Sequence, residues 1–255
     1  ATAAYPIYAS AFYALSVLPE DFHEWEYLAN SRTPEAYNKI VKGNADIIFV
    51  AQPSGGQKKR AEESGVTLIY TPFAREAFVF IVNADNPVNS LTEQQVRDIF
   101  SGAITNWRTV GGNDQEIQTW QRPEDSGSQT VMQSQVMKNV RMISPQETEV
   151  ASMMEGMIKV VAEYRNTNNA IGYTFRYYAT QMNDDKNIKL LAINGIAPTA
   201  ENIRNGKYPY IVDAFMVTRE NTTSETQKLL EWFLTPQGQS LVEDVGYVPM
   251  YKTLP

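Results

Sequence analysis

The residues best suited to bind a ligand lie in one short segment, 120–130, with the sequence WQRPEDSGSQT. Arg122 is followed by Ser-Gly-Ser and then by apolar residues at helical spacing. This pattern predicts a loop that enters a helix, with Asp125 or Ser126 as the N-cap. Backbone N–H groups at a helix start, serine hydroxyls and a guanidinium can all donate hydrogen bonds to a small oxyanion. A capped surface helix with an arginine nearby would have the same pattern, so the segment alone leaves both interpretations open.

Two other segments also have the pattern of a loop that enters a helix. Near the beginning of the sequence, apolar residues at helical spacing follow Thr2 and Ala3. The Thr2 hydroxyl and the Ala3 N–H could bind an anion, although a simple N-cap is the better explanation of this threonine by itself. In the segment 31–37, Thr33 is expected at the N-cap and Pro34 at the first helical position.

Composition excludes several classes of protein. A net charge of −7 argues against nucleic-acid binding, which requires a basic face. The absence of cysteine removes thiol catalysis, cysteine-bound zinc and disulfides. The single histidine, His23, lies in a charged stretch and is expected to be exposed, so a catalytic triad or a histidine metal cluster is not expected. No apolar run reaches membrane-spanning length, and no signal-peptide pattern opens the chain. We expect no metal and no cofactor.

Apolar runs and helical patterns alternate along the chain, which predicts an α/β fold. Without an internal repeat or a linker, any second domain must be interleaved with the first. The continuous apolar run at 46–51 is typical of a strand buried on both faces of a parallel sheet. Gly172 is expected where another backbone approaches closely. Further strands are expected at 66–70, 77–82, 117–120, 169–175 and 211–218, and helices at 57–64, 153–161, 226–234, 238–245, between Thr33 and Gly43, and between Thr92 and Gly102.

Several segments, taken in order, carry a family resemblance. They are ATAAYPIY (1–8), SRTPEAY (31–37) before ADIIFVAQPS (45–54), REAFVF (75–80), IFSGAITNW (99–107), QRPEDSGSQT (121–130), and TPQGQ (235–239) before GYVP (246–249). With these segments the chain resembles the substrate-binding proteins of phosphate ABC transporters, in the variant common in Gram-positive bacteria. The matching segments extend over nearly the whole sequence.

The resemblance implies a two-lobed periplasmic-binding-protein fold of class II, with two hinge crossings and the ligand in the interlobe cleft. Residues 1–77 and 211–255 would form lobe I, and residues 78–210 would form lobe II. Glu124 would orient Arg122. The phosphate contacts carried over by position are Thr2, the N–H of Ala3, Thr33, Arg122, Ser126, the N–H of Gly127, and Ser128.

By the same resemblance, the chain would be an extracytoplasmic, non-enzymatic receptor that binds inorganic phosphate and delivers it to the membrane permease of an ABC transporter. We expect a monomer that is periplasmic or, in the full-length precursor, a membrane-anchored lipoprotein at the cell surface. A receptor for another tetrahedral oxyanion such as sulfate is an alternative, as is a phosphate-sensing or adhesion module on the same fold. A phosphate-ester hydrolase is disfavoured, since the sequence offers no metal cluster and no histidine base.

The sequence departs from the family pattern in two places. Many members have an aspartate that accepts the proton of hydrogen phosphate where this chain has Ala51. Such a carboxylate also rejects sulfate, which has no proton to share, so the change leaves selectivity open. Glu124 could replace this acceptor, but the charge partner of Arg122 is its expected role. The family also has a strand before the first anion loop, whereas this sequence opens inside that loop.

Overall fold

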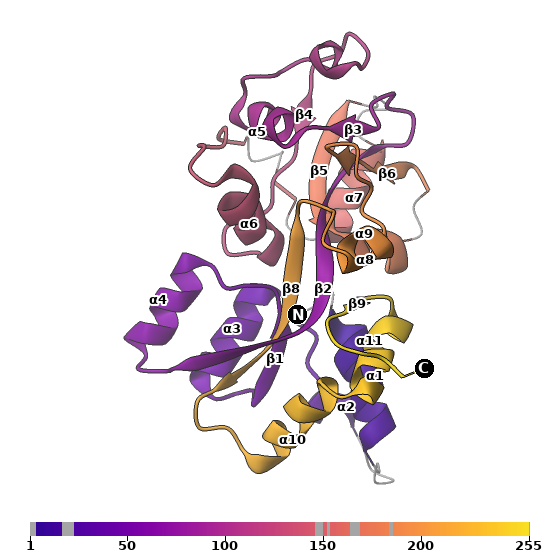
Figure 1. Cartoon of the computed structure of the whole chain (residues 1–255). Helices are drawn as coiled ribbons and strands as arrows, with labels where there is room; N and C mark the ends of the chain where they lie inside the picture. Colours follow the sequence, from indigo (N-terminus) through magenta and orange to yellow (C-terminus); the bar gives the residue numbers. More distant parts are fainter. Residues whose placement is uncertain are drawn as a thin grey trace. The chain divides into compact units, whose positions relative to one another are not determined.

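The computed structural model describes residues 4–16, 23–145, 150–151, 154–163, 169–183 and 186–254. The chain divides into two compact units. Unit 1 comprises Ala1–Arg75, Asp125–Gly127 and Asp213–Pro255, and unit 2 comprises Glu76–Glu124 and Ser128–Val212. The chain passes from unit 1 to unit 2 within strand β2 (Leu68–Asn83) and returns within strand β8 (Ile211–Arg219), as the colours of Figure 1 allow the reader to follow.

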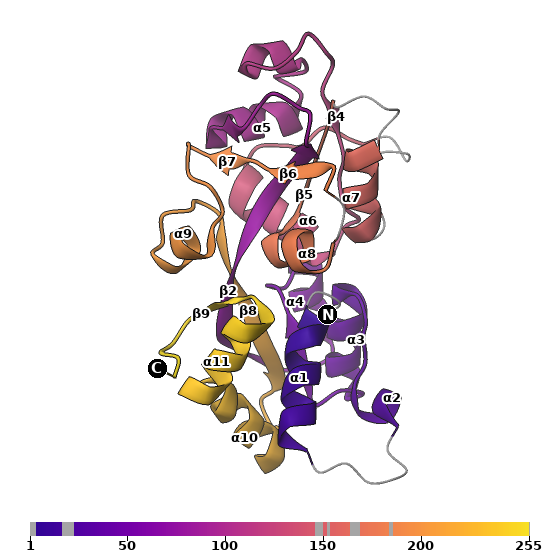
Figure 2. The same ribbon diagram turned by 90° about the vertical axis from the view of Figure 1, so that its right-hand side faces the viewer.

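Unit 1 contains helices on both sides of β1 in the sequence, together with the two C-terminal helices. Its elements, besides parts of β2 and β8, are α1 (Tyr5–Leu15), α2 (Glu24–Tyr27), α3 (Thr33–Lys42), β1 (Ile47–Val50), α4 (Gly55–Glu63), α10 (Ser224–Phe233), α11 (Pro236–Val245) and β9 (Val248–Pro249). Helices α1 and α11 lie side by side in this unit (Figure 2).

Strand β1 is buried as its apolar sequence predicts, but its pairing differs from the expectation. It pairs antiparallel with β8, with Ile47 opposite Thr218, so the predicted parallel arrangement is wrong. A continuous apolar run reports that both faces of a strand are covered, and it carries no information about the direction of the neighbouring strand. A core cluster around β1 covers it: Ala36, Tyr37, Ile40, Ile48, Val50 and Val217.

The TPQGQ segment serves to fix the C-terminal part of unit 1. Thr235 caps α11 by accepting a hydrogen bond from the Gly238 N–H at 3.2 Å, and Pro236 occupies the first turn. Gln239 is fully buried, and its amide nitrogen donates to the carbonyls of Phe73 and Phe233. Its amide oxygen accepts from the backbone N–H groups of residues 250 and 251. The glutamine therefore ties β2, α10 and the chain after β9 together.

Unit 2 holds shorter elements around β2 and β5. Its elements, besides parts of β2 and β8, are β3 (Ser90–Leu91), α5 (Glu93–Ser101), the 3-10 helix η2 (Trp107–Val110), β4 (Gln118–Thr119), α6 (Gly127–Val131), the π-helix η3 (Met132–Met137), α7 (Met154–Glu163), β5 (Ala170–Phe175), α8 (Arg176–Gln181), β6 (Ile188–Leu190), β7 (Ala192–Ile193) and α9 (Ala200–Arg204). Helix α6 begins at Gly127, the last unit 1 residue of the segment Asp125–Gly127.

Strand β2 joins two strands that the sequence suggested as separate. Residues 68–70 of the first apolar run and the whole run at 77–82 belong to one strand of 16 residues. Its partners change along its length, because residues 74–75 pair with β9 and residues 78–82 pair with β5. The polar residues between the two runs remain in the strand because different strands satisfy the backbone on each side.

Helix α7 packs on β5 at Gly172. A Cβ atom at this glycine would collide with the Met157 sulfur and touch Val161 at 3.0 Å. The close approach expected at Gly172 is therefore made by side chains of α7 and not by a backbone. An aromatic cluster completes this core: Phe78, Phe80, Phe100 and Tyr173.

Candidate functional site

Arg122 follows the edge of the unit 2 sheet, as the sequence predicts for the segment after 117–120. Strand β4 pairs in parallel with β5. Beyond β4, Gln121 forms a parallel bridge with Val150, and its carbonyl accepts a hydrogen bond from the Ala151 N–H at 2.9 Å. These backbone contacts fix the residue immediately before Arg122. The backbone position of Arg122 is therefore determined by the sheet.

Arg122 is anchored through both its backbone and its side chain. Its backbone N–H donates to the Tyr173 hydroxyl at 3.1 Å and to the Gln129 amide oxygen at 3.3 Å. Its guanidinium donates through Nη1 to the Ala151 carbonyl at 2.7 Å. The residue is only 7% exposed. A guanidinium held in one orientation loses little conformational freedom when it binds an anion through its planar fork.

Tyr173 and Gln129 form a buried pair beneath Arg122. The Tyr173 hydroxyl donates to the amide oxygen of Gln129, which leaves that hydroxyl's lone pairs to accept from the Arg122 N–H. Burial raises the pKa of Tyr173 well above its ordinary value, so the phenol keeps its proton near neutral pH. The pair therefore supplies fixed, uncharged acceptors to the backbone of Arg122.

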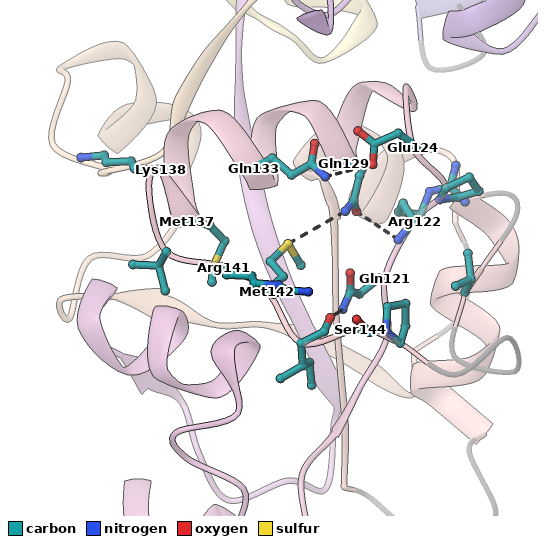
Figure 3. Close-up of a pocket in the computed structure, with 15 residues that line it drawn as sticks. Gln121, Arg122, Glu124, Gln129, Gln133, Met137, Lys138, Arg141, Met142 and Ser144 are labelled. Atoms are coloured by element: carbon teal, nitrogen blue, oxygen red, sulfur yellow. Dashed lines mark hydrogen bonds between the residues drawn. The ribbon is translucent and has the colours of Figure 1, made fainter. Parts of the chain in front are cut away.

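A pocket of about 560 Å³ lies in unit 2 beside Arg122 (Figure 3). Cationic, amide and apolar side chains line it, including Arg122, Lys138, Arg141, Gln121, Gln129, Met137 and Met142. Glu124 also lines the pocket, and its carboxylate accepts from the Gln133 side chain at 3.0 Å. Of the residues expected to bind phosphate, the pocket contains Arg122 together with its expected partner Glu124; Ser126, Gly127 and Ser128 are not part of its lining.

The Ser-Gly-Ser segment forms the start of a helix. Helix α6 begins at Gly127, directly after Ser126, and continues into the π-helix η3. Ser128 is buried. The apolar residues at helical spacing that follow this segment are completely or almost completely buried: Val131, Met132, Val136 and Met137. The predicted loop-to-helix transition is therefore present, and Asp125 precedes it with a positive φ of 64°.

Of the two binding loops expected in unit 1, the structure describes the residues expected to bind phosphate in only one. Thr2 and Ala3 lie outside the described residues. Thr33 is the first residue of α3, and Arg32 is the N-cap, one position earlier than predicted. The shift occurs because the Glu35 carboxylate accepts from the Arg32 backbone N–H at 3.2 Å and also pairs with its guanidinium at 2.9 Å. Thr33 is half-buried in the first turn.

The described residues offer neither a metal site nor a membrane span. No group of three or more acidic, histidine or cysteine side chains among them could hold a metal ion. Within the same part of the chain, none of the helices combines the length and the apolar character that crossing a bilayer requires. His23 is exposed, as the sequence predicts.

Comparison with known proteins places this geometry in a family. A family model described as a PBP superfamily domain matches residues 3–237. The chain belongs to the PBP superfamily. Among solved structures, a Clostridium perfringens protein with bound phosphate aligns with a TM-score of 0.76 at 22% identity, over 98% of this chain and 97% of that one. An ABC-type phosphate transport receptor from Vibrio cholerae aligns with a TM-score of 0.63 at 24% identity, over 88% and 85% of the two chains. The two-lobed α/β periplasmic-binding fold implied by the resemblance is confirmed.

The chain is also similar to curated proteins. The phosphate-binding protein PstS of Bacillus subtilis is 29% identical to it, over 82% of this chain and 64% of that protein. The phosphate-binding protein PstS of Borreliella burgdorferi is 26% identical over 83% of this chain and 74% of that protein. The chain thus matches less than two thirds of the length of the Bacillus relative. The resemblance to phosphate-transporter binding proteins is confirmed by the names of these relatives.

The sequence did not predict which residues hold Arg122 in place. Tyr173 lies in an apolar strand pattern and reads as a core residue, while Gln129 reads as a polar residue of a helix. Their contacts join positions 122, 129 and 173, which no local pattern links. The signal that was available was chemical: a tyrosine inside a buried strand requires a hydrogen-bond partner for its hydroxyl.

Proposed function

We propose that this chain is an extracytoplasmic solute-binding protein that captures inorganic phosphate and delivers it to the permease of an ABC transporter. The observation that carries the proposal is Arg122, a nearly buried arginine held at its backbone and guanidinium next to a helix start with serine hydroxyls. Such donors, fixed before the ligand arrives, favour a small oxyanion. The names of the Bacillus and Borreliella relatives support phosphate as that anion.

The proposed ligands are the residues that the family resemblance indicates. They are Thr2, the N–H of Ala3, Thr33, Arg122, Ser126, the N–H of Gly127, and Ser128, with Glu124 as the supporting carboxylate. We further propose lobe I as residues 1–77 and 211–255 and lobe II as residues 78–210. The proposed protein acts as a monomer, binds no nucleic acid and catalyses no reaction. It is periplasmic or anchored at the cell surface as a lipoprotein.

Calorimetry of the purified chain with phosphate, sulfate and arsenate tests the proposal. We expect phosphate to bind and Arg122→Ala to abolish the binding while the thermal unfolding transition is kept. Arg108→Ala is the matched control, because Arg108 is an exposed arginine of the same unit, paired with Asp114 at 3.1 Å. Unchanged phosphate affinity in the Arg122→Ala variant would refute the assignment of Arg122, and a chain that takes up no phosphate would refute the function.

A second candidate is a receptor for another tetrahedral oxyanion such as sulfate. It is favoured by Ala51, because the family resemblance implies a proton-accepting aspartate at this position in many members. The same calorimetry separates the candidates, because a sulfate receptor would prefer sulfate over phosphate at a pH where both are dianions.

A further inference from the structure

Asp125 is held by three donors from one face of α4. Ser54 Oγ donates to Asp125 Oδ1, and Arg60 Nη2 donates to Asp125 Oδ2 at 2.8 Å. Gln57 Nε2 donates to the Asp125 backbone carbonyl at 3.0 Å. Positions 54, 57 and 60 are spaced by three residues and therefore share a helix face. All three oxygen atoms of Asp125 are thus bound by α4 and its N-cap.

The donors are themselves fixed by the capping of α4. Ser54 accepts from the Gln57 N–H at 3.1 Å, and its own N–H donates to Gln57 Oε1 at 2.9 Å. This capping box commits the Gln57 amide oxygen to Ser54, so the amide nitrogen is directed at Asp125. The helix therefore presents its donors to Asp125 in a set orientation.

Gly56 provides the room for this contact. A Cβ atom at position 56 would lie 3.3 Å from Asp125 Oδ1 and 3.4 Å from Arg60 Nη1. A side chain here would therefore require the Asp125 carboxylate to shift by a small amount from its contact with Arg60.

The negative charge of Asp125 is paired with the positive charge of Arg60. The hydrogen bond from Ser54 and the Arg60 guanidinium lower the pKa of the Asp125 carboxyl, which keeps it ionised. An ionised carboxylate one residue before Ser126 would repel an anion bound there. Pairing with Arg60 offsets that repulsion, and the hydrogen bonds hold the backbone at its positive φ of 64°, which is uncommon for a residue with a side chain.

We propose that these contacts form a clasp, made of Asp125 with Ser54, Gln57 and Arg60, that positions the peptide carrying Ser126 and Gly127 for phosphate binding. Asp125 is a positioning residue and does not touch the anion. Through these hydrogen bonds the segment Asp125–Gly127 is attached to α4 of unit 1. The inference rests on the proposed phosphate site.

We expect the clasp to control the rate at which phosphate dissociates. Opening it would free the backbone and hydroxyl donors of residues 126 and 127, so it should affect the dissociation rate of phosphate more than the association rate. Part of its strength comes from an ion pair whose side chains are 46% and 23% exposed. Salt should therefore weaken the attraction between Arg60 and Asp125.

Asp125→Gly tests the clasp with little backbone strain, because glycine adopts a φ of 64° freely. We expect the Kd for inorganic phosphate to rise roughly 3- to 10-fold, mainly through faster release in stopped-flow measurements. Arg60→Gln should act in the same direction, with an effect that shrinks at high salt. In the double variant, Arg60→Gln should add little, because its partner is already gone.

Lys59→Gln is the matched control. Lys59 lies on the same helix, carries the same charge as Arg60, and pairs with Glu63 at 3.6 Å. We expect it to leave phosphate binding unchanged. If Arg60→Gln and Lys59→Gln weaken binding equally, or if Asp125→Gly binds and releases phosphate as the wild type does, the clasp is refuted. A wild-type chain that gives no heat with phosphate would instead refute the proposed function, so the two failures are distinct.

Discussion

The Tyr173 hydroxyl lies 3.1 Å from the backbone nitrogen of Arg122, across 51 residues of sequence. The same hydroxyl donates to Gln129, whose amide oxygen also accepts from the Arg122 N–H. Arg122 is therefore positioned by a strand, through Tyr173, and by a helix, through Gln129. Precise placement of a binding side chain depends on such support.

Tyr173→Phe should weaken phosphate binding while the protein stays folded. The change removes one acceptor from the Arg122 N–H and one donor from Gln129, so we expect the free energy of unfolding to fall by about 1 to 2 kcal/mol. We expect the Kd for phosphate to rise roughly 3- to 10-fold, because Arg122 loses part of its support. Calorimetry with phosphate and urea unfolding measure the two effects.

Tyr208→Phe is the control for that experiment. The Tyr208 hydroxyl is buried in the same unit and donates to the Phe78 carbonyl at 3.1 Å. Its loss should destabilise unit 2 by a similar amount and leave the phosphate Kd unchanged. Equal weakening of binding by both variants would mean that general loosening of unit 2, and not support of Arg122, explains the result.

Ala51→Asp should sharpen the preference for phosphate over sulfate. Ala51 follows β1, and its carbonyl is fixed by the Tyr37 hydroxyl at 3.1 Å, so a side chain at this position starts from a defined backbone. A carboxylate accepts a proton from hydrogen phosphate but only repels sulfate. We expect the phosphate-to-sulfate affinity ratio, measured by competition calorimetry, to rise by about tenfold or more.

Ala51→Asn separates charge from size in this test. The neutral amide is close in shape to the carboxylate but can donate to either anion, so it should not sharpen the ratio. If sulfate competes equally well in the wild type, the aspartate variant and the asparagine variant, position 51 does not control selectivity.

Glu76 should make stability depend on pH. Its carboxylate is fully buried in unit 2 and accepts from the backbone N–H groups of Ala77 at 2.7 Å and Tyr177 at 2.8 Å. Desolvation raises the pKa of Glu76 from 4.5 to about 7, against the opposing effect of these donors and of Arg176. Between these two pKa values the native state binds more protons than the unfolded state. The contribution of Glu76 is therefore fully present below the unfolded pKa and is lost as pH rises through about 7.

Urea unfolding of the wild type and Glu76→Gln from pH 4 to 8 measures this contribution. Glutamine does not titrate, so the wild type should lose roughly 1 to 3 kcal/mol relative to the variant as pH rises. Glu231→Gln changes an exposed carboxylate and should leave the profile parallel to that of the wild type. Parallel profiles for wild type and Glu76→Gln would contradict the shifted pKa.

Features that depend on neighbouring residues could be predicted from the sequence. Thr92 begins the helix expected between Thr92 and Gly102, and it caps α5 through a capping box with Gln95, with reciprocal hydrogen bonds of 3.1 and 2.8 Å. Gly43 and Gly102 end their helices with positive φ, as expected. These interactions span at most a few residues, so the types and spacing of the side chains suffice to specify them.

Strand partners required the tertiary structure. The sequence suggested a parallel neighbour for β1 and two strands in place of β2, because apolar runs report burial and not pairing direction or continuity. The apolar composition of a strand indicates that both of its faces are buried. The partner of that strand depends on segments far away in the sequence. The family resemblance supplied the fold class, which periodicity alone left at α/β.

The sequence by itself determined that Arg122 stands after a strand and before a helix that begins within the Ser-Gly-Ser segment. Only the tertiary structure decided what holds these groups: Tyr173 beneath Arg122, and Ser54 against Asp125, 71 residues away. Local order follows from the conformational preferences of adjacent residues. The support of a binding group comes from side chains that meet only after the chain has folded, and their hydrogen bonds leave no periodic pattern in the sequence.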